Sequence, residues 1–159
     1  MKNVRIEIKW GLLFILSGLI WMILEKSLGW HDLHLEKHAT YTLFYAPIAI
    51  LIYVLALLDK KRNDYHGKMT YFQGLISGVL VTFVVVGLTP LSQYITHTYI
   101  SPDYFSNVIA LSIQQGHLDE QGAKAYFSLR NYIFQSTIFA AVMGLLTSAV
   151  VSIFIRSRV

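Results

Sequence analysis

The sequence predicts an all-α polytopic membrane protein with four transmembrane helices. Hydrophobic residues make up 55% of the 159 residues and charged residues only 14%, whereas a soluble domain carries about 25% charged residues. The charges gather in a few clusters, and the runs between them approach the roughly 20 apolar residues that a membrane span needs. The length predicts a single integral-membrane domain, residues 1–159. Because the chain contains no cysteine, disulfide and thiolate chemistry are excluded.

The predicted spans cover residues 10–30, 39–58, 71–95 and 132–155. The first carries Glu25 and Lys26 near its end, where their side chains can reach the lipid headgroups. This segment could instead be a cleaved signal peptide, but no Ala-x-Ala-like site follows it, and we therefore retain it as a span. Pro47 and Pro90 fall inside the second and third spans, where each is expected to kink its helix.

The distribution of basic residues predicts the orientation of the spans. Nine Lys and Arg residues flank the side with both termini and the 59–70 loop, and four flank the other side. The positive-inside rule therefore places both termini in the cytoplasm and residues 29–38 and 96–131 outside. Because the basic residues border the spans, we attribute the net charge of +4 to membrane topology and expect no nucleic-acid partner.

The 96–131 segment is too long for a turn and too polar to span the membrane. Ser101-Pro102-Asp103 is typical of a helix start, with a capping hydroxyl and a proline in the first turn. Apolar residues follow at helical spacing until Gly116, after which Asp119 can cap a second helix. We therefore predict two short amphipathic helices, which either lie at the outer membrane surface or cover the bundle.

Small residues predict how the third and fourth spans pack. Gly74 and Gly78 form a GxxxG motif in the third span, and in the fourth a small residue recurs at every fourth position, namely Ser136, Ala140, Gly144, Ser148 and Ser152. In lipid, such faces allow helix backbones to approach closely. We expect the two faces to pack within one chain; a homodimer interface is the alternative.

The order of these features resembles a known family. The basic loop leads into residues 67–74 (GKMTYFQG), and the third span is followed by residues 100–105 (ISPDYF). In these features the chain is similar to the domain-of-unknown-function 4199 family of bacterial integral membrane proteins. The resemblance implies a small four-span protein of the bacterial cytoplasmic (inner) membrane, and it assigns no activity, cofactor or site residue.

The common motifs of enzymes are missing from the sequence. We find no GxxxxGK[ST], GxGxxG, HExxH or GxSxG pattern, and we expect no enzymatic activity and no cofactor. The main prediction is a non-enzymatic structural or accessory component of the lipid bilayer, which assembles or stabilises a membrane-protein partner.

A polar stripe on the third span suggests an alternative function. Its members are Thr89, Ser92, Gln93, Thr96 and His97, which share one face of the predicted helix. They either hydrogen-bond neighbouring helices or line the path of a small oligomeric carrier or channel. In the second case we expect Gln93 and His97 to face a solvated outer cavity.

The loop at 29–38 suggests a third, metal-related function. If this segment is helical, His31, His34 and His38 share a face and can bind Zn²⁺ or Cu²⁺ through neutral imidazoles; otherwise they are solvated. Glu25 and Arg130, near the outer ends of the first and fourth spans, are expected either to pair with each other or to extend to the headgroups.

Overall fold

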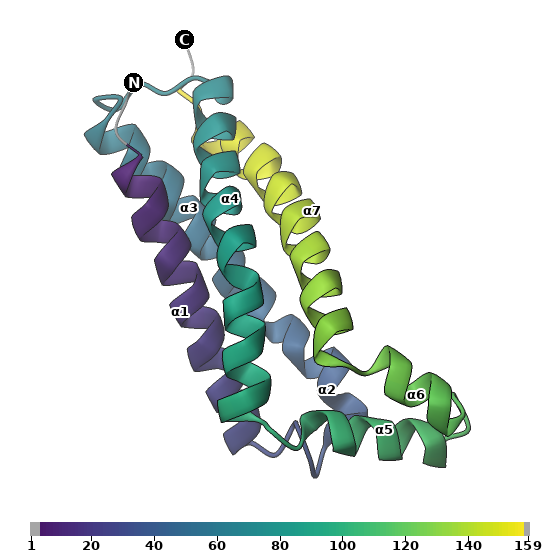
Figure 1. Cartoon of the computed structure of the whole chain (residues 1–159). Coiled ribbons are helices and arrows are strands. Elements are labelled where there is room, and N and C mark those ends of the chain that lie inside the picture. The colour runs from purple at the N-terminus through teal and green to yellow at the C-terminus, as the bar shows by residue number, and fades with distance from the viewer. Residues whose placement is uncertain (1–3, 158–159) are drawn as a thin grey trace.

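Four long apolar helices run side by side in the computed structural model, which describes residues 4–157 (Figure 1). The first is α1 (Arg5–Ser27). The third, α4 (Tyr71–Ile95), continues as a π-helical turn, η3 (Thr96–Ile100), and the fourth is α7 (Leu129–Ile155). Together with the second span, described next, each is long and apolar enough to cross a membrane. The predicted fold class, all-α with four transmembrane helices, is confirmed.

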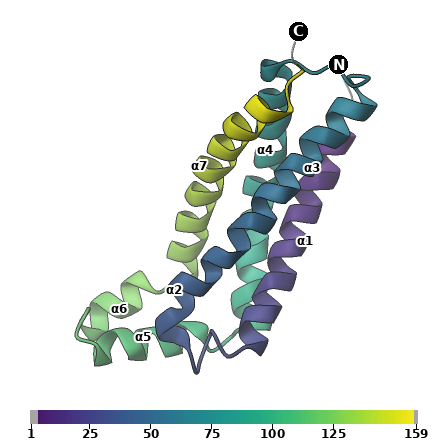
Figure 2. The ribbon, with the colours of Figure 1, turned by 180° about the vertical axis from the view of Figure 1, so that it is seen from behind.

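The second span, Leu35–Asn63, is built from several short pieces. It consists of η1 (Leu35–Lys37), α2 (His38–Tyr41), η2 (Thr42–Tyr45) and α3 (Ala46–Asn63). Pro47 therefore lies in the first turn of α3, where the missing N–H has no helical partner to lose, and not in mid-helix as predicted. Figure 2, which views the molecule from the side opposite to Figure 1, shows this irregular segment leading into α3.

The start of α1 and the end of α7 lie at one end of the bundle, which we call the proximal end; the opposite end is the distal end (Figure 1). At the distal end, α5 (Tyr104–Gln114) and α6 (Glu120–Tyr126) form a hairpin that projects sideways from the long helices. Asp119 caps α6 as expected, since its Oδ1 accepts from the N–H of Gly122 at 2.8 Å. Ser101 does not cap α5, because η3 extends to Ile100 and α5 begins only at Tyr104.

Helices α4 and α7 form the closest helix pair, through small side chains. A Cβ added to Gly78 would lie 2.5 Å from Ser148 Oγ, and one added to Gly74 would lie 3.0 Å from Ser152 Oγ. Such distances leave little or no room for a side chain, so the two backbones approach closely. The GxxxG motif of the third span therefore packs on the small-residue face of the fourth span within one chain.

The middle of α7 also contacts α3. A Cβ added to Gly144 would lie 2.5 Å from Thr82 Cγ2 and 2.7 Å from the Tyr53 hydroxyl, and that hydroxyl is 2.8 Å from Thr82 Oγ1. Ala140 packs on the edge of the core. Ser136, farther along the same face, is half-buried, and its hydroxyl donates to the Tyr132 carbonyl.

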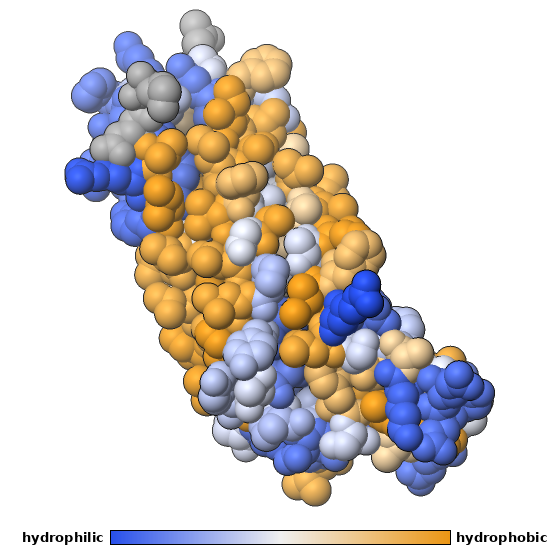
Figure 3. All heavy atoms as spheres, viewed as in Figure 1, coloured by the Kyte–Doolittle hydropathy of each residue, from blue (hydrophilic) through white to orange (hydrophobic). Residues whose placement is uncertain are grey.

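The hydrophobic core lies between the long helices on the proximal side of their centre. Its fully buried members are Tyr53, Ala56, Leu57, Met69, Val81, Val85, Val151 and Ile155. Many other large apolar side chains point outward, and Figure 3 shows them as a hydrophobic belt along the long helices with hydrophilic residues at both ends. This distribution is the one that a lipid environment favours, because the outer surface of the helices can face acyl chains.

Candidate metal centre

A fully buried carboxylate lies at the distal end of α1. Glu25 is in the last turns of the helix, yet its side chain is 0% exposed. One turn earlier, the indole Nε1 of Trp21 donates to Glu25 Oε1 at 2.5 Å. The second carboxylate oxygen of Glu25, Oε2, faces two histidines. Burying a carboxylate is costly unless it is paired, so the groups around Oε2 determine what this site can do.

Two imidazoles converge on this second oxygen. His31 Nε2 and His38 Nε2 each lie 3.1 Å from Glu25 Oε2. The His31 side chain is 0% exposed and the His38 side chain 17% exposed, so the cluster is closed on one side and reachable on the other. One ligand atom from each of the three residues lies within 4.8 Å of the other two. We call Glu25, His31 and His38 the distal cluster.

A tight turn after α1 brings His31 to the carboxylate. Gly29 has a φ of +74°, a left-handed conformation that glycine adopts without strain and that often follows a helix end. The turn is closed by hydrogen bonds from the Trp30 N–H to the Glu25 carbonyl (3.0 Å) and from the His34 N–H to the Gly29 carbonyl (2.8 Å). The chain therefore folds back under the end of α1 and buries the His31 ring beside Glu25.

Helix α5 supplies a second layer of contacts around the distal cluster. The Tyr104 hydroxyl lies 3.4 Å from His38 Nδ1 and 3.3 Å from the Tyr132 hydroxyl, and Asn107 Nδ2 donates to the His31 carbonyl at 3.2 Å. Burial raises the pKa of the Tyr104 hydroxyl well above its usual value, so it stays protonated at physiological pH. Tyr104 can therefore orient the His38 ring through the nitrogen that does not face Glu25.

One nitrogen of the distal cluster has no protein partner. His31 Nδ1 is buried without a hydrogen bond to any residue that the structure describes, and the same holds for Nδ1 of the neighbouring His97. Buried polar atoms are nearly always hydrogen-bonded, and exceptions are typical of functional sites or of sites that hold water or an ion. The protein groups alone thus leave the cluster incompletely satisfied.

The family model described as "Protein of unknown function (DUF4199)" matches residues 9–157. The chain belongs to this family. No curated protein and no solved structure matches the chain. The family match and the four apolar helices agree with a multi-pass membrane protein, and they assign no specific role.

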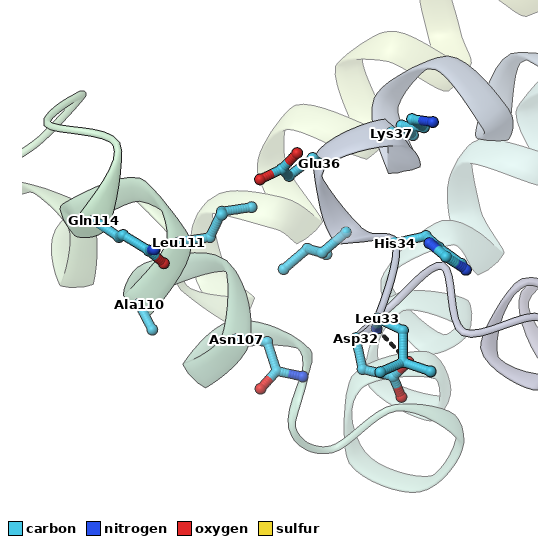
Figure 4. Close-up of a pocket in the computed structure, with 10 residues that line it drawn as sticks. Asp32, Leu33, His34, Glu36, Lys37, Asn107, Ala110, Leu111 and Gln114 are labelled. Carbon is cyan, nitrogen blue, oxygen red and sulfur yellow. Dashed lines mark hydrogen bonds between the residues drawn. The ribbon is translucent and has the colours of Figure 1, made fainter.

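The structure brings together two of the three histidines that the sequence suggested as ligands. His34 is exposed and lines a surface groove between the loop and α5, opposite Asn107 and Gln114 (Figure 4). The shared face expected for His31, His34 and His38 is not formed, because residues 28–34 are a series of turns and only Leu35–Lys37 forms a short 3-10 helix. The i, i+3, i+7 spacing of a continuous helix therefore does not apply.

Glu25 takes the place that sequence reasoning gave to His34. The expectation that Glu25 would pair with Arg130 or extend to the headgroups was wrong, since Glu25 is buried against two histidines and Arg130 is exposed. The available signal was an ionisable residue inside an apolar segment, followed by histidines 6 and 13 residues later. In membrane proteins such residues usually face the protein interior and mark functional sites.

The predicted polar stripe lies against other parts of the chain. Thr89, Thr96 and His97 are buried, whereas Ser92 and Gln93 are half-buried. Gln93 Oε1 lies 3.1 Å from His97 Nε2. The His97 ring, with the residue 9% exposed, packs against Tyr104, Phe105 and Tyr132. The solvated cavity expected at His97 is thus filled by aromatic side chains, because α5 folds over the end of α4.

Proposed function

We propose that this chain is a non-enzymatic accessory membrane protein that binds one divalent transition-metal ion, Zn²⁺ in the first place, at the distal cluster. The observation that carries the proposal is the convergence of one carboxylate oxygen and two imidazole nitrogens in a buried site. These are the ligand types of zinc sites with two histidines and one glutamate.

The distances in the distal cluster suit a small metal ion. Zinc bonds of about 2.0–2.1 Å in tetrahedral geometry place neighbouring ligand atoms about 3.3 Å apart. Glu25 Oε2 lies 3.1 Å from each imidazole nitrogen, so the carboxylate is already at ligand spacing from both. All three ligand atoms lie within 4.8 Å of one another.

The charge balance of the site also favours a cation. A carboxylate that is fully withdrawn from solvent needs an opposite charge or several hydrogen bonds. Neutral imidazoles supply hydrogen bonds only, whereas a divalent ion supplies charge and binds neutral imidazoles directly. Three protein ligands leave a fourth position for water or for a group from a partner, and the exposed edge of His38 gives access to it.

A bound ion would connect three consecutive segments of the chain. Glu25 belongs to α1, His31 to the turn that follows, and His38 to the start of the second span. Tyr104 would extend this connection to α5 through its hydroxyl. This arrangement supports the accessory role, since a metal at the distal cluster would set the position of the projecting hairpin that a partner protein can contact.

The decisive measurement is the metal content of protein that has been purified without a histidine tag. After incubation with Zn²⁺ and removal of excess metal at pH 7.5, we expect about one zinc per chain by elemental mass spectrometry. His38→Ala should abolish most of this binding. His34→Ala is the matched control and should retain it, because His34 lies outside the distal cluster. Absence of zinc, or equal zinc in the two variants, would overturn the proposal.

The proposed location is the bacterial inner membrane, with both termini in the cytoplasm and the distal cluster outside. The positive-inside distribution of Lys and Arg supports this orientation. In the cysteine-free background, a membrane-impermeant maleimide added to intact cells should label Gln121→Cys on α6 and not His66→Cys in the proximal loop. The reverse labelling pattern would invert the orientation and place the distal cluster on the cytoplasmic side.

A further inference from the structure

A groove lies in the corner between the end of α6 and the first turns of α7, where the hairpin projects away from the bundle (Figures 1 and 2). Ala125 of α6 and Ser128 line it on one side of the turn, and Arg130, Asn131 and Phe134 line it from α7. The groove opens to the outside of the bundle, beside the hydrophobic surface of α7. It shares none of these residues with the distal cluster.

Two of the polar side chains in the groove hold its shape. Asn131 Nδ2 donates to the carbonyls of Ala125 (2.7 Å) and Tyr126 (3.3 Å), and Ser128 Oγ donates to the Ala125 carbonyl at 3.3 Å. Arg130 differs from both, because its exposed guanidinium forms no ion pair with any acidic side chain among residues 4–157. The groove therefore presents, in the first turn of α7, one cation without an ion-pair partner among the residues that the structure describes.

The position of Arg130 along α7 corresponds to the depth of lipid phosphates. Helix α7 ends at Ile155, and at 1.5 Å per residue Arg130 lies about 37 Å from that end. The hydrocarbon core of a bilayer is about 30 Å thick, and the headgroup regions extend the total to about 40–45 Å. When the proximal end of α7 lies at one edge of the hydrocarbon, Arg130 lies just beyond the opposite edge.

An apolar stripe runs from Arg130 toward the middle of the membrane. Phe134 and Ile138 follow at intervals of four residues, which places them on the same face of α7 as Arg130. Phe134 is 65% exposed and Ile138 49% exposed, so both present large apolar surfaces to the lipid. A cation above an apolar stripe is complementary to an anionic headgroup above an acyl chain.

We propose that this groove binds one phospholipid from the distal leaflet, with its phosphate at Arg130 and an acyl chain along Phe134 and Ile138. The planar guanidinium suits phosphate because it can donate two parallel hydrogen bonds to it. Free phosphate would gain nothing from the apolar stripe, whereas a phospholipid uses both parts of the groove. The bound lipid would hold the α5–α6 hairpin at the membrane surface.

Three probes separate the phospholipid from simpler ligands. Delipidated protein in detergent is mixed with phosphatidylglycerol, with a diacylglycerol of the same chains, or with inorganic phosphate, and occupancy is measured by native mass spectrometry. We expect a saturable one-to-one complex with phosphatidylglycerol alone. Equal binding of the diacylglycerol, or displacement of the lipid by millimolar inorganic phosphate, would overturn the proposal.

Two variants of equal charge test the place of binding. Arg130→Gln should weaken phosphatidylglycerol binding about fivefold, the effect expected for one basic residue at a lipid surface. Lys124→Gln removes one positive charge from the neighbouring helix α6, where Lys124 is exposed and paired with Glu120, and it should leave binding unchanged. Equal weakening by both substitutions would indicate non-specific attraction and contradict the proposed site.

Further variants keep the test informative if Arg130→Gln does not fold. Arg130→Lys keeps the charge and should retain most of the binding, whereas Phe134→Ala removes part of the acyl-chain contact and should weaken it. Two measurements control for folding. A zinc content equal to that of the wild type indicates that the variant retains the distal cluster, and circular dichroism reports on the helical fold without depending on the metal. Unchanged binding in Phe134→Ala would exclude the apolar stripe from the site.

Discussion

Helix α1 buries one glutamate near each of its ends, and the two carboxylates are compensated by different chemistry. At the proximal end, Glu7 lies 2.8 Å from Lys60 Nζ, which also contacts Asp64 at 2.7 Å. The Ser77 hydroxyl donates to Glu7 at 2.8 Å. At the distal end, Glu25 has two histidines in place of the lysine. We call Glu7, Lys60, Asp64 and Ser77 the proximal cluster.

The two clusters surround the same kind of buried group, a glutamate carboxylate, with different side chains. Lysine brings a permanent positive charge, so the buried Glu7 carboxylate is paired with an opposite charge from the protein itself, and the proximal cluster joins α1, α3 and α4. Histidine brings nitrogen atoms that can exchange a hydrogen bond for a bond to a metal. The proposed metal would therefore add positive charge to the distal cluster, whereas the proximal cluster already has a positive charge in Lys60.

The largest expected effect is on stability, at the proximal cluster. Lys60→Met should lower the free energy of unfolding by about 3–5 kcal/mol, because removal of the lysine leaves the buried Glu7 carboxylate without the opposite charge that Lys60 provides. The double variant Glu7→Gln/Lys60→Met should recover much of that loss. Denaturation in mixed micelles measures both. If Lys60→Met is no more destabilising than substitution of the exposed Lys124, the proximal cluster has no structural role.

The next prediction uses the stabilisation by added zinc to distinguish Glu25 from Glu7. Zinc at 100 times its dissociation constant should stabilise the wild-type protein by about 2.7 kcal/mol, and Glu25→Gln should remove this gain by removing a ligand. Glu7→Gln lowers stability in the absence of metal and should keep the zinc-dependent gain. The measurement is the shift in the unfolding midpoint on adding Zn²⁺. A gain that disappears in both variants would contradict the assignment of the metal to the distal cluster.

Acidification should weaken the distal cluster selectively. Only neutral imidazole binds a metal, so protons compete with Zn²⁺ as the pH falls. We expect zinc affinity to decrease by roughly tenfold or more between pH 7.5 and pH 5.5, the interval in which ordinary histidines become charged. Competition with a chelator of known pH dependence measures the change. An affinity independent of pH would exclude histidine ligands.

The smallest predicted effect concerns the second layer of the distal cluster. Tyr104→Phe removes the hydroxyl near His38 Nδ1 and should lower zinc affinity about tenfold, the lower end of the range for groups that orient a ligand. The control is Tyr99→Phe, which should leave zinc affinity unchanged. Tyr99 is exposed and lies in η3, shortly before Tyr104. If the two variants bind zinc equally, Tyr104 has only a packing role.

The sequence by itself determined the membrane architecture, because hydropathy and small-residue spacing are local properties. Four spans, two short distal helices and the contact faces around Gly78 and Ser148 could be predicted in this way. Helix boundaries were less accurate: α5 begins at Tyr104 because η3 prolongs the third span. The irregular start of the second span was not predicted either, since its short 3-10 pieces have no clear signal in apolar periodicity.

Only the tertiary structure decided which ionisable residues meet. From the sequence, Glu25 was expected to pair with Arg130 or to reach the headgroups, and Lys60 was expected to flank the second span. Both residues are instead buried in clusters. Their partners come from other segments, placed by the Gly29 turn at the distal end and by the packing of α1 on α3 at the proximal end. The sequence pattern grouped His31, His34 and His38 because it assumed a helix, whereas the chain turns there and the structure brings only His31 and His38 to Glu25.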